Sequence, residues 1–252
     1  MPDYSRIAIV TGATSGIGEA TARKFVSAGL AVVGHGRNSA KLEELEKELW
    51  PAFCGIADDA AAAGLAERLF EAANERFAKP ASIVVVNAGR GLGGSVKDAD
   101  LAEFEEMLRT NVTGALRLMQ VAARRLTAAQ EGNYPRSAAD IVVIGSVVGR
   151  HVSPFSAIYG ASKFALHSLA EALRREIGPK GVRVSLVEPG IVVSGFQAVA
   201  GYSDELTKMF DDRFGPLLYG ADIADAIHHV VGLPPHVHIS DIVVRPTRQD
   251  YP

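Results

Sequence analysis

The amino-acid sequence predicts one α/β domain, built as a doubly wound parallel sheet with helices on both faces. Short β-branched runs alternate with longer runs rich in Ala, Leu, Glu and Arg along the 252 residues, as expected where strands and helices alternate. Several strand candidates are continuously apolar, as at 83–86 and 141–144, which indicates that both faces of those strands are covered. Neither a repeat nor a linker interrupts the pattern, so we expect residues 1–252 to form a single domain.

Each element follows from one run of this pattern. Seven strands are expected, at residues 7–11, 31–35, 52–57, 82–87, 140–146, 182–188 and 242–245. Helices are expected at residues 16–28, 39–48, 60–77, 100–129, 157–177 and 220–231. The stretch 131–139 is expected to be a loop, and the mixed stretch 194–216 is expected to be irregular and to serve as a substrate lid. Ligands of such sheets bind at the carboxyl ends of the strands, so the residues just after each strand are the candidates for a site.

Composition and charge exclude several functional classes. Apolar residues make up 48% of the chain and charged residues 22%, as in an ordinary globular protein. The formal net charge is −3 and no basic block is present, so we expect neither a nucleic acid nor a membrane as partner. The chain lacks the run of roughly 18 apolar residues that spans a bilayer, and its start lacks the features of a signal peptide. Cys54 is the only cysteine, which rules out an intrachain disulfide and makes a cytoplasmic location the expectation.

A glycine-rich turn follows the first predicted strand. It reads Thr11-Gly12-Ala13-Thr14-Ser15-Gly16-Ile17-Gly18 and leads directly into a helical pattern. Glycines let the backbone approach a pyrophosphate closely, and the start of a helix offers N–H groups and a positive dipole end. The spacing is G-x-x-x-G-x-G rather than the general dinucleotide fingerprint. We predict that this turn binds the phosphates of a dinucleotide cofactor.

The residues after the second predicted strand favour NADP over NAD. A site that prefers NAD usually has an acidic residue there, which binds the ribose 2′-hydroxyl. The segment here is Gly34-His35-Gly36-Arg37-Asn38, which contains no acid. A guanidinium can hold a 2′-phosphate through two parallel hydrogen bonds. Arg37, with Asn38 beside it, is therefore the predicted 2′-phosphate site; the alternative is a solvated arginine at a helix start.

A serine, a tyrosine and a lysine are spaced for acid–base chemistry. Ser146 ends the fifth predicted strand, Tyr159 follows thirteen residues later, and Lys163 lies four residues beyond it, on the same helix face. An isolated tyrosine ionises near pH 10, and an ammonium about 4 Å away stabilises the phenolate by on the order of 4 kcal/mol at an effective dielectric near 20. We predict that Tyr159 is the acid/base of a hydride transfer between a nicotinamide and a carbonyl or alcohol. Lys163 is predicted to lower its pKa, and Ser146 to polarise the substrate oxygen.

This ordered set of motifs resembles the short-chain dehydrogenase/reductase family, in its short single-domain branch, over nearly the whole chain. The resemblance implies a Rossmann fold and an NADP-dependent oxidoreductase. It also implies that Asn111, in Thr110-Asn111-Val112-Thr113-Gly114, is a fourth catalytic residue that helps hold a water in a proton relay to Lys163. The cofactor contacts that it implies are made by Tyr159 and Lys163 themselves and by Asp58 (or Asp59) on the adenine side, Asn87, Ala88, Gly89, Pro189, Gly190, Ile191 and Ser194.

The chain departs from the family pattern at three places. Val86 stands where the family usually has the first of two asparagines, which we expect to alter local stability more than chemistry. Ser15 stands where many NADP enzymes carry a second basic residue, so the NADP preference depends mainly on Arg37. The ending, 242–249, is similar to that of the subgroup that acts on small 3-hydroxy acids and related polar alcohols.

Several other residues leave alternatives open. Arg90 and Arg150 follow strand ends, where they either bind a substrate carboxylate or are solvated. The cluster of histidines 228, 229, 236 and 238 lacks partners at ligand spacing, so we expect no metal. The substrate pocket is expected to be lined by Val147, Val148, His151, Phe155, Gly190 and the 194–216 segment.

The long apolar helices at 100–129 and 157–177 predict a homo-oligomer, since the family resemblance implies that they pair across a dimer axis and build a tetramer. A dimer, or a monomer with well-covered helices, is the alternative. A carbonyl reductase or alcohol dehydrogenase is the leading function. A catalytically silent NADP-binding regulatory protein, or a redox-assisted isomerase or dehydratase, is the alternative. The presence of all four predicted catalytic residues favours the enzyme.

Overall fold

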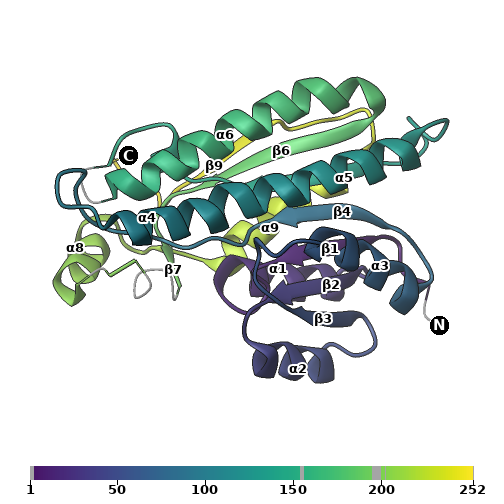
Figure 1. Ribbon diagram of the computed structural model, residues 1–252, viewed down its shortest axis with the longest axis horizontal. Helices are drawn as coiled ribbons and strands as arrows, with labels where there is room; N and C mark the ends of the chain where they lie inside the picture. The colour runs from purple at the N-terminus through teal and green to yellow at the C-terminus, as the bar shows by residue number, and fades with distance from the viewer. Residues whose placement is uncertain (1–2, 154–155, 195–199, 202, 252) are drawn as a thin grey trace.

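Seven parallel strands form one sheet at the centre of the molecule, in the order β3-β2-β1-β4-β5-β6-β9 (Figure 1). The structure is a computed structural model that describes residues 3–153, 156–194, 200–201 and 203–251. The strands are β1 (Ile7–Thr11), β2 (Ala31–Gly36), β3 (Phe53–Ala57), β4 (Ala81–Val86), β5 (Ala139–Ile144), β6 (Val182–Pro189) and β9 (Asp241–Val244). This is the doubly wound Rossmann fold that the sequence predicts.

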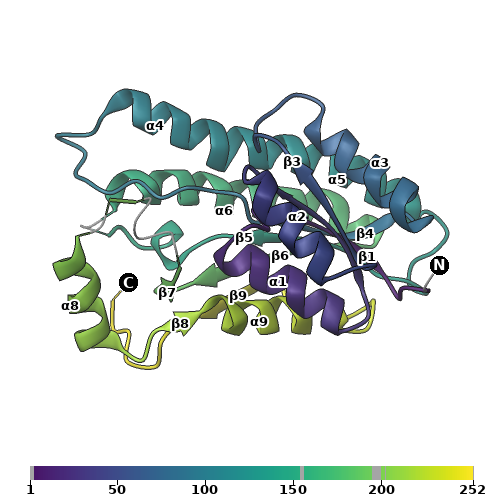
Figure 2. The same cartoon turned by 90° about the horizontal axis from the view of Figure 1, so that it is seen from below.

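Helices cover both faces of the sheet. They are α1 (Gly16–Ser27), α2 (Ser39–Glu48), α3 (Leu65–Phe77), α4 (Leu101–Leu108), α5 (Ala115–Gln130), α6 (Ala157–Ile177), α8 (Asp204–Phe214) and α9 (Gly220–Gly232). Apolar side chains of α1, α2 and α9 pack against one face, and those of α3, α5 and α6 against the other (Figure 2). Of the helices described, none is long and apolar enough to cross a membrane.

The predicted strands and most helices are confirmed, with two differences among the helices. The helix expected from residue 60 begins at Leu65, after Gly64 adopts φ 76°. The helix expected at 100–129 contains a π-helical segment, Arg109–Gly114, between α4 and α5. Short 3-10 turns lie at Val147–Gly149 and Gly178–Lys180.

The expectation that 194–216 is irregular is wrong in its second half, because this part forms α8. Ser203 caps that helix by accepting a hydrogen bond from the Leu206 N–H, and Asp204 and Glu205 occupy its first turn, where acidic residues favour the helix dipole. Two short strands, β7 (Val192–Val193) and β8 (Leu218–Tyr219), pair on either side of this segment. The loop at 131–139 is confirmed up to the start of β5 at Ala139.

Candidate active site

A cavity of about 470 Å³ opens at the carboxyl ends of the strands, between the turn after β1, the ends of β4, β5 and β6, and helices α6 and α8. Most predicted site residues line it: Gly12, Thr14, Ser15, Gly16, Ile17, Arg37, Asn87, Ala88, Gly89, Ser146, Tyr159, Lys163, Pro189, Gly190, Ile191 and Ser194. Gly18, Asn38, Asp58 and Asn111 lie outside its lining.

The glycine turn has the shape that a phosphate cradle requires. Gly12 and Gly16 have φ of 68° and 53°, and a Cβ on Gly18 would lie 2.1 Å from the carbonyl oxygen of Gly12. Within the described part of the chain, the Ser15 side chain makes no capping hydrogen bond to α1, whereas α2, α4 and α8 are each capped by a side chain. The first N–H groups of α1 are thus left without a side-chain cap at the edge of the cavity. These residues fit the pyrophosphate of a dinucleotide.

Asn87 braces this turn from the neighbouring strand. Its amide nitrogen donates to the Thr11 carbonyl (2.8 Å), and the Thr11 hydroxyl accepts from the backbone N–H groups of Asn87 (3.0 Å) and Ala88 (3.1 Å). Val86, in place of a family asparagine, is 3% exposed in the core. The substitution therefore adds apolar packing behind the cavity rather than a polar group inside it.

On the adenine side, the structure separates the two candidate aspartates. Asp59 lines the cavity, and its carboxylate accepts hydrogen bonds from Arg109 at 3.0 and 2.6 Å, which hold the pKa of Asp59 below its usual range. Asp58 instead pairs with Arg68. Arg37 is exposed at the rim of the cavity, while the Asn38 side chain accepts from the Lys41 N–H and caps α2.

The predicted acid–base group comes together at the junction of β5 and α6. The Lys163 ammonium lies 5.6 Å from the centroid of the Tyr159 ring and donates to the Ile144 carbonyl at 2.8 Å. Burial lowers the pKa of Lys163 to about 8. Ser146, which follows β5, lines the same cavity, and its hydroxyl accepts from the Val148 N–H at 3.3 Å.

Asn111 lies behind this group, in the π-helical segment between α4 and α5, and is 1% exposed. Its side-chain oxygen accepts from the Arg90 N–H (2.8 Å), and its amide donates to the Arg90 carbonyl (2.9 Å) and to the Ser162 hydroxyl (3.1 Å). The side chain therefore fixes the segment after Gly89 against α6. A π-helical segment widens a helix locally and often marks a functional position.

The chain after β9 contributes a residue that the sequence analysis did not assign to the site. Gln249 is 8% exposed and lines the cavity. Its side-chain oxygen accepts from the Ile191 N–H at 3.0 Å, and a Cβ on Gly190 would lie 2.3 Å from that oxygen. Gln249 thereby holds the Gly190–Ile191 segment. In the sequence, the only indication that Gln249 belongs to the site is the similarity of residues 242–249 to the ending of a family subgroup.

The substrate end of the cavity differs in part from expectation. Val147, Val148 and Gly190 line it, together with Met209, Phe210, Arg213 and Phe214 from α8 and with Tyr251. His151 lies outside the lining, and Phe155 falls outside the described residues. Arg90 lines the cavity and pairs with Glu103.

Arg150 lies outside the cavity lining; its side chain is 45% exposed, and it binds the buried carboxylate of Glu188 at 2.7 and 2.5 Å. Among the histidines, His238 bonds the Val184 carbonyl at 2.9 Å. The described residues include no group of three His, Cys, Asp or Glu side chains that could hold a metal ion.

Fold and cavity together define a dinucleotide-binding protein of the Rossmann class with a buried lysine beside a tyrosine. Comparison with known proteins gives the family: residues 6–203 match the short chain dehydrogenase family, and the chain belongs to it. It is therefore an oxidoreductase enzyme.

Individual relatives match over almost the whole chain. A serine 3-dehydrogenase of Agrobacterium fabrum is 33% identical over 245 residues, which cover 96% of this chain and 94% of that protein. A sulfoacetaldehyde reductase 2 of Chromohalobacter salexigens is 33% identical over 252 residues, which cover 97% and 96%. Among solved structures, the closed form of serine dehydrogenase complexed with NADP+ has a TM-score of 0.81 at 29% identity, covering 97% of this chain and 96% of that one.

Proposed function

We propose that this protein is an NADP-dependent oxidoreductase that interconverts a carbonyl and an alcohol, with Tyr159 as acid/base. The observation that carries the proposal is the buried Lys163 ammonium beside the Tyr159 ring, in the same cavity as the glycine turn. When bound, the nicotinamide supplies or accepts the hydride. Tyr159 gives its proton to the carbonyl oxygen in reduction and takes it back in oxidation, while the positive charge of Lys163 favours the phenolate. The Ser146 hydroxyl donates a hydrogen bond to the same oxygen.

The preference for NADP is supported by Arg37, which is exposed at the rim where the 2′-phosphate of the cofactor would lie. It is also supported by the similarity to a serine dehydrogenase that was solved with NADP+. On the adenine side we favour Asp59 over Asp58, because only Asp59 lines the cavity. The proton relay through Asn111 stays a prediction, since its side chain is bonded to Arg90 and Ser162.

For the substrate we propose a small alcohol or aldehyde that carries an acidic group. Arg213 lines the substrate end of the cavity from α8, and it donates to both carboxylate oxygens of Asp250 at 3.1 Å. Both side chains are more than half exposed, so a substrate carboxylate or sulfonate can replace Asp250 on the guanidinium. Serine and sulfoacetaldehyde, which name two relatives, carry such groups. A lid formed by the 194–216 segment stays a prediction.

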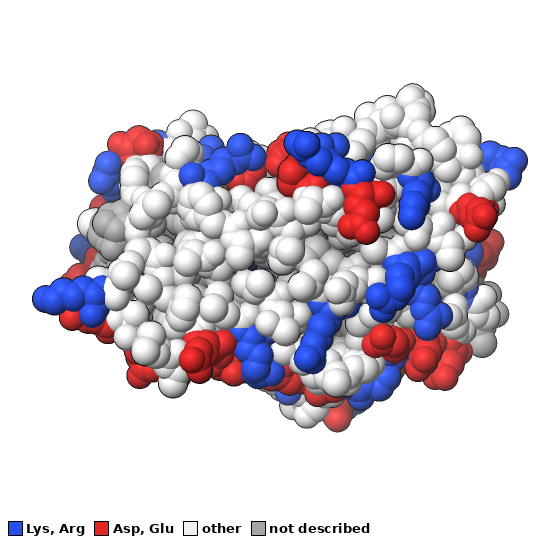
Figure 3. All heavy atoms as spheres, turned by 45° about the horizontal axis from the view of Figure 1, so that its top comes forward, with Lys and Arg blue, Asp and Glu red and all other residues white. Residues whose placement is uncertain are grey.

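Assembly through α4, α5 and α6 is proposed on surface composition. Figure 3 shows a broad face with few charged side chains, bordered by Lys, Arg, Asp and Glu. Leu116 of α5 and Phe164 of α6 are exposed apolar residues, at 36% and 43%. A second copy of the chain would cover them, and the substitution Phe164→Asp is expected to reduce the mass measured by light scattering. A cytoplasmic location stays a prediction from the single cysteine.

The proposed function is tested by following the oxidation of NADPH and of NADH with a panel of aldehydes. The panel pairs anionic and neutral compounds of equal length, and serine is tested in the oxidative direction. We expect turnover with NADPH, higher kcat/KM for the anionic members, and a loss of about 10³-fold in kcat for Tyr159→Phe. Tight NADPH binding with no turnover across the panel would favour a regulatory protein, and higher kcat/KM with NADH would contradict the role of Arg37.

A further inference from the structure

His167 lies directly behind the predicted catalytic serine. It follows Lys163 by four residues on α6, as Lys163 follows Tyr159, so the three side chains occupy neighbouring positions on one side of the helix. The Nε2 atom of His167 accepts a hydrogen bond from the backbone N–H of Ser146 at 3.2 Å. A Cβ on Gly145 or on Gly149 would come within 2.3–2.4 Å of the imidazole ring. The two glycines that flank the Ser146 turn thus make room for this ring.

Hydrogen bonding defines the protonation of the ring. Because the Ser146 N–H is a donor, Nε2 carries the lone pair and the ring proton lies on Nδ1. Nδ1 lies 3.8 Å from Oε2 of Glu188, whose side chain is fully buried and held by Arg150. Burial has the largest effect on the pKa of His167 and lowers it to about 4. Smaller electrostatic effects on this pKa come from the charged groups of Glu188, Lys163, Arg150 and Asp241. The ring is therefore neutral near pH 7 and remains an acceptor.

Ser146, His167 and Glu188 are the residue types of a hydrolase catalytic triad, but their geometry differs from that of a triad. In such a triad the histidine bonds the serine hydroxyl. Here it bonds the serine backbone, and the Ser146 hydroxyl accepts from the Val148 N–H. His167 can therefore hold the Ser146 backbone in place, but it cannot remove the proton of the Ser146 hydroxyl.

Two hydrogen bonds connect α6 to the end of β5, one on each side of Gly145. Lys163 donates to the Ile144 carbonyl (2.8 Å) and His167 accepts from the Ser146 N–H (3.2 Å). Tyr159 projects from the same helix, so these bonds determine the distance between the groups from α6 and the hydroxyl from β5. A displacement of about 1 Å between catalytic groups can cost on the order of 100-fold in rate.

We propose that His167, supported by Glu188 and Arg150, is a positioning residue that fixes the distance between the Ser146 hydroxyl and the Tyr159 hydroxyl. The proposal rests on the proposed function, because it assumes that Ser146 binds the substrate oxygen.

Two variants of similar size and polarity test this inference. In His167→Gln the side-chain oxygen can reach the position of Nε2 and accept from the Ser146 N–H. In His167→Asn the shorter amide ends near Nδ1, and the Ser146 N–H loses its acceptor. We expect kcat to fall by about 10- to 100-fold in the Asn variant and to stay near the wild-type value in the Gln variant. The Kd for NADPH should be unchanged in both.

Equal kcat in the wild type and the Asn variant, with Tyr159→Phe inactive, would overturn the role of His167 and leave the proposed function intact. Equal losses in the Gln and Asn variants would also overturn it. If the wild type turns over no substrate, the proposed function fails first. Long-range ¹H–¹⁵N spectra of the wild-type protein then still test the geometry: a proton on Nδ1 is expected, and a proton on Nε2 would refute it.

Discussion

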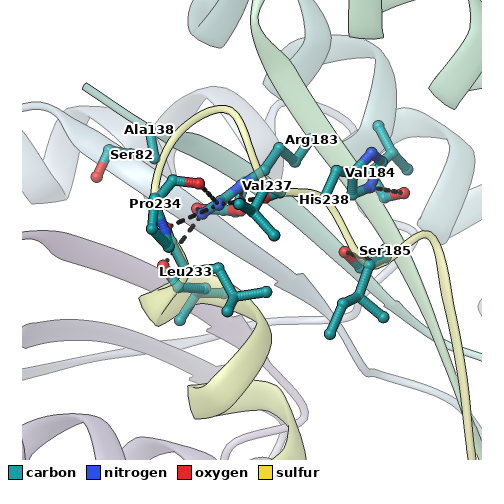
Figure 4. Close-up of polar contacts among 12 residues, drawn as sticks. Ser82, Ala138, Arg183, Val184, Ser185, Leu233, Pro234, Val237 and His238 are labelled. Atoms are coloured by element: carbon teal, nitrogen blue, oxygen red, sulfur yellow. Dashed lines mark hydrogen bonds and ion pairs between the residues drawn. The ribbon is translucent and has the colours of Figure 1, made fainter. Parts of the chain in front are cut away.

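The two ends of the sheet differ in how the charged ends of the helix dipoles are bound. At the carboxyl ends of the strands, α1 begins beside an open cavity without a side-chain cap. At the amino ends, carbonyl groups at the end of α9 and in the loop after it accept hydrogen bonds from arginines of the chain itself. Arg183 donates to the carbonyl of Val231 and to those of Leu233, Pro234 and Val237, which are labelled in Figure 4.

The amino-end cluster is a buried ion network. Asp140, 2% exposed, accepts from Arg183 at 2.7 and 3.0 Å and from Arg6 at 2.6 Å. Two guanidinium groups and one carboxylate leave an excess positive charge, which faces the negative end of the α9 dipole. Arg6 also donates to the carbonyls of Ser82, Ala138 and Val231, so the network joins five segments of the chain. This fold therefore completes its polar contacts internally at the amino ends of the strands and leaves a helix terminus for a ligand at their carboxyl ends.

The largest expected effect at the amino end is on stability alone. Arg183→Met removes two of the three hydrogen bonds to the buried Asp140 carboxylate, which then keeps only Arg6 as a partner, and it leaves the carbonyls of Leu233, Pro234 and Val237 without this donor. We expect the free energy of unfolding to fall by about 3–5 kcal/mol, measured by urea denaturation, with kcat of the folded protein unchanged. Arg175→Met is the control, since Arg175 is exposed and its loss is expected to cost less than about 1 kcal/mol. If Arg183→Met lowered kcat without lowering the free energy of unfolding, the amino-end cluster would not be a purely stabilising element.

At the carboxyl end a buried charge should lower stability in a pH-dependent way. Burial lowers the pKa of Lys163 from 10.5 to about 8. Between these values the unfolded chain binds a proton that the folded chain lacks, so the free energy of unfolding rises with pH. Below about pH 8 both states are protonated, and the cost of burial, on the order of 3 kcal/mol, is fully present.

This pH dependence is measured against Lys163→Met, which lacks the titrating group. The difference in unfolding free energy between the two proteins should move in favour of the wild type as the pH rises from about 8 to 10.5. Parallel stability curves would show that the ammonium is not desolvated in the folded state.

The smallest effect is expected at the substrate end. Arg213→Gln should raise KM about 5-fold for aldehydes with a carboxylate or sulfonate, because an exposed charged hydrogen bond contributes about 1 kcal/mol. Neutral aldehydes of the same length should be unaffected. Asp250→Asn is the matched variant and should lower KM for the anionic substrates, since it removes the competing carboxylate. Equal changes in KM for charged and neutral substrates would place the anionic group elsewhere.

The sequence predicts those parts of the molecule that depend on local pattern. Continuous apolarity identified the strands, and glycines identified the turn after β1. The motif spacing also predicted that Ser146, Tyr159 and Lys163 share one site, and all three line the same cavity. The bonds of Asn111 to Arg90 and Ser162 depend on tertiary contacts across 21 and 51 positions, which spacing does not report. Gln249 and His167 were missed for the same reason, because each acts on a backbone N–H brought near by the fold. Helix α8 was missed although Ser203, Asp204 and Glu205 form a helix-start signal.

The end of the described chain has a practical consequence for work on this protein. Gln249 binds the Ile191 N–H, and the Tyr251 hydroxyl donates to the Val152 carbonyl at 2.6 Å, so residues 249–251 run along the rim of the cavity. An affinity tag or fluorescent label fused after them would emerge beside the substrate entrance and compete for Arg213 if it were acidic. The start of the described chain lies at the opposite end of the molecule (Figure 1). Purification handles and surface-immobilisation linkers therefore belong there.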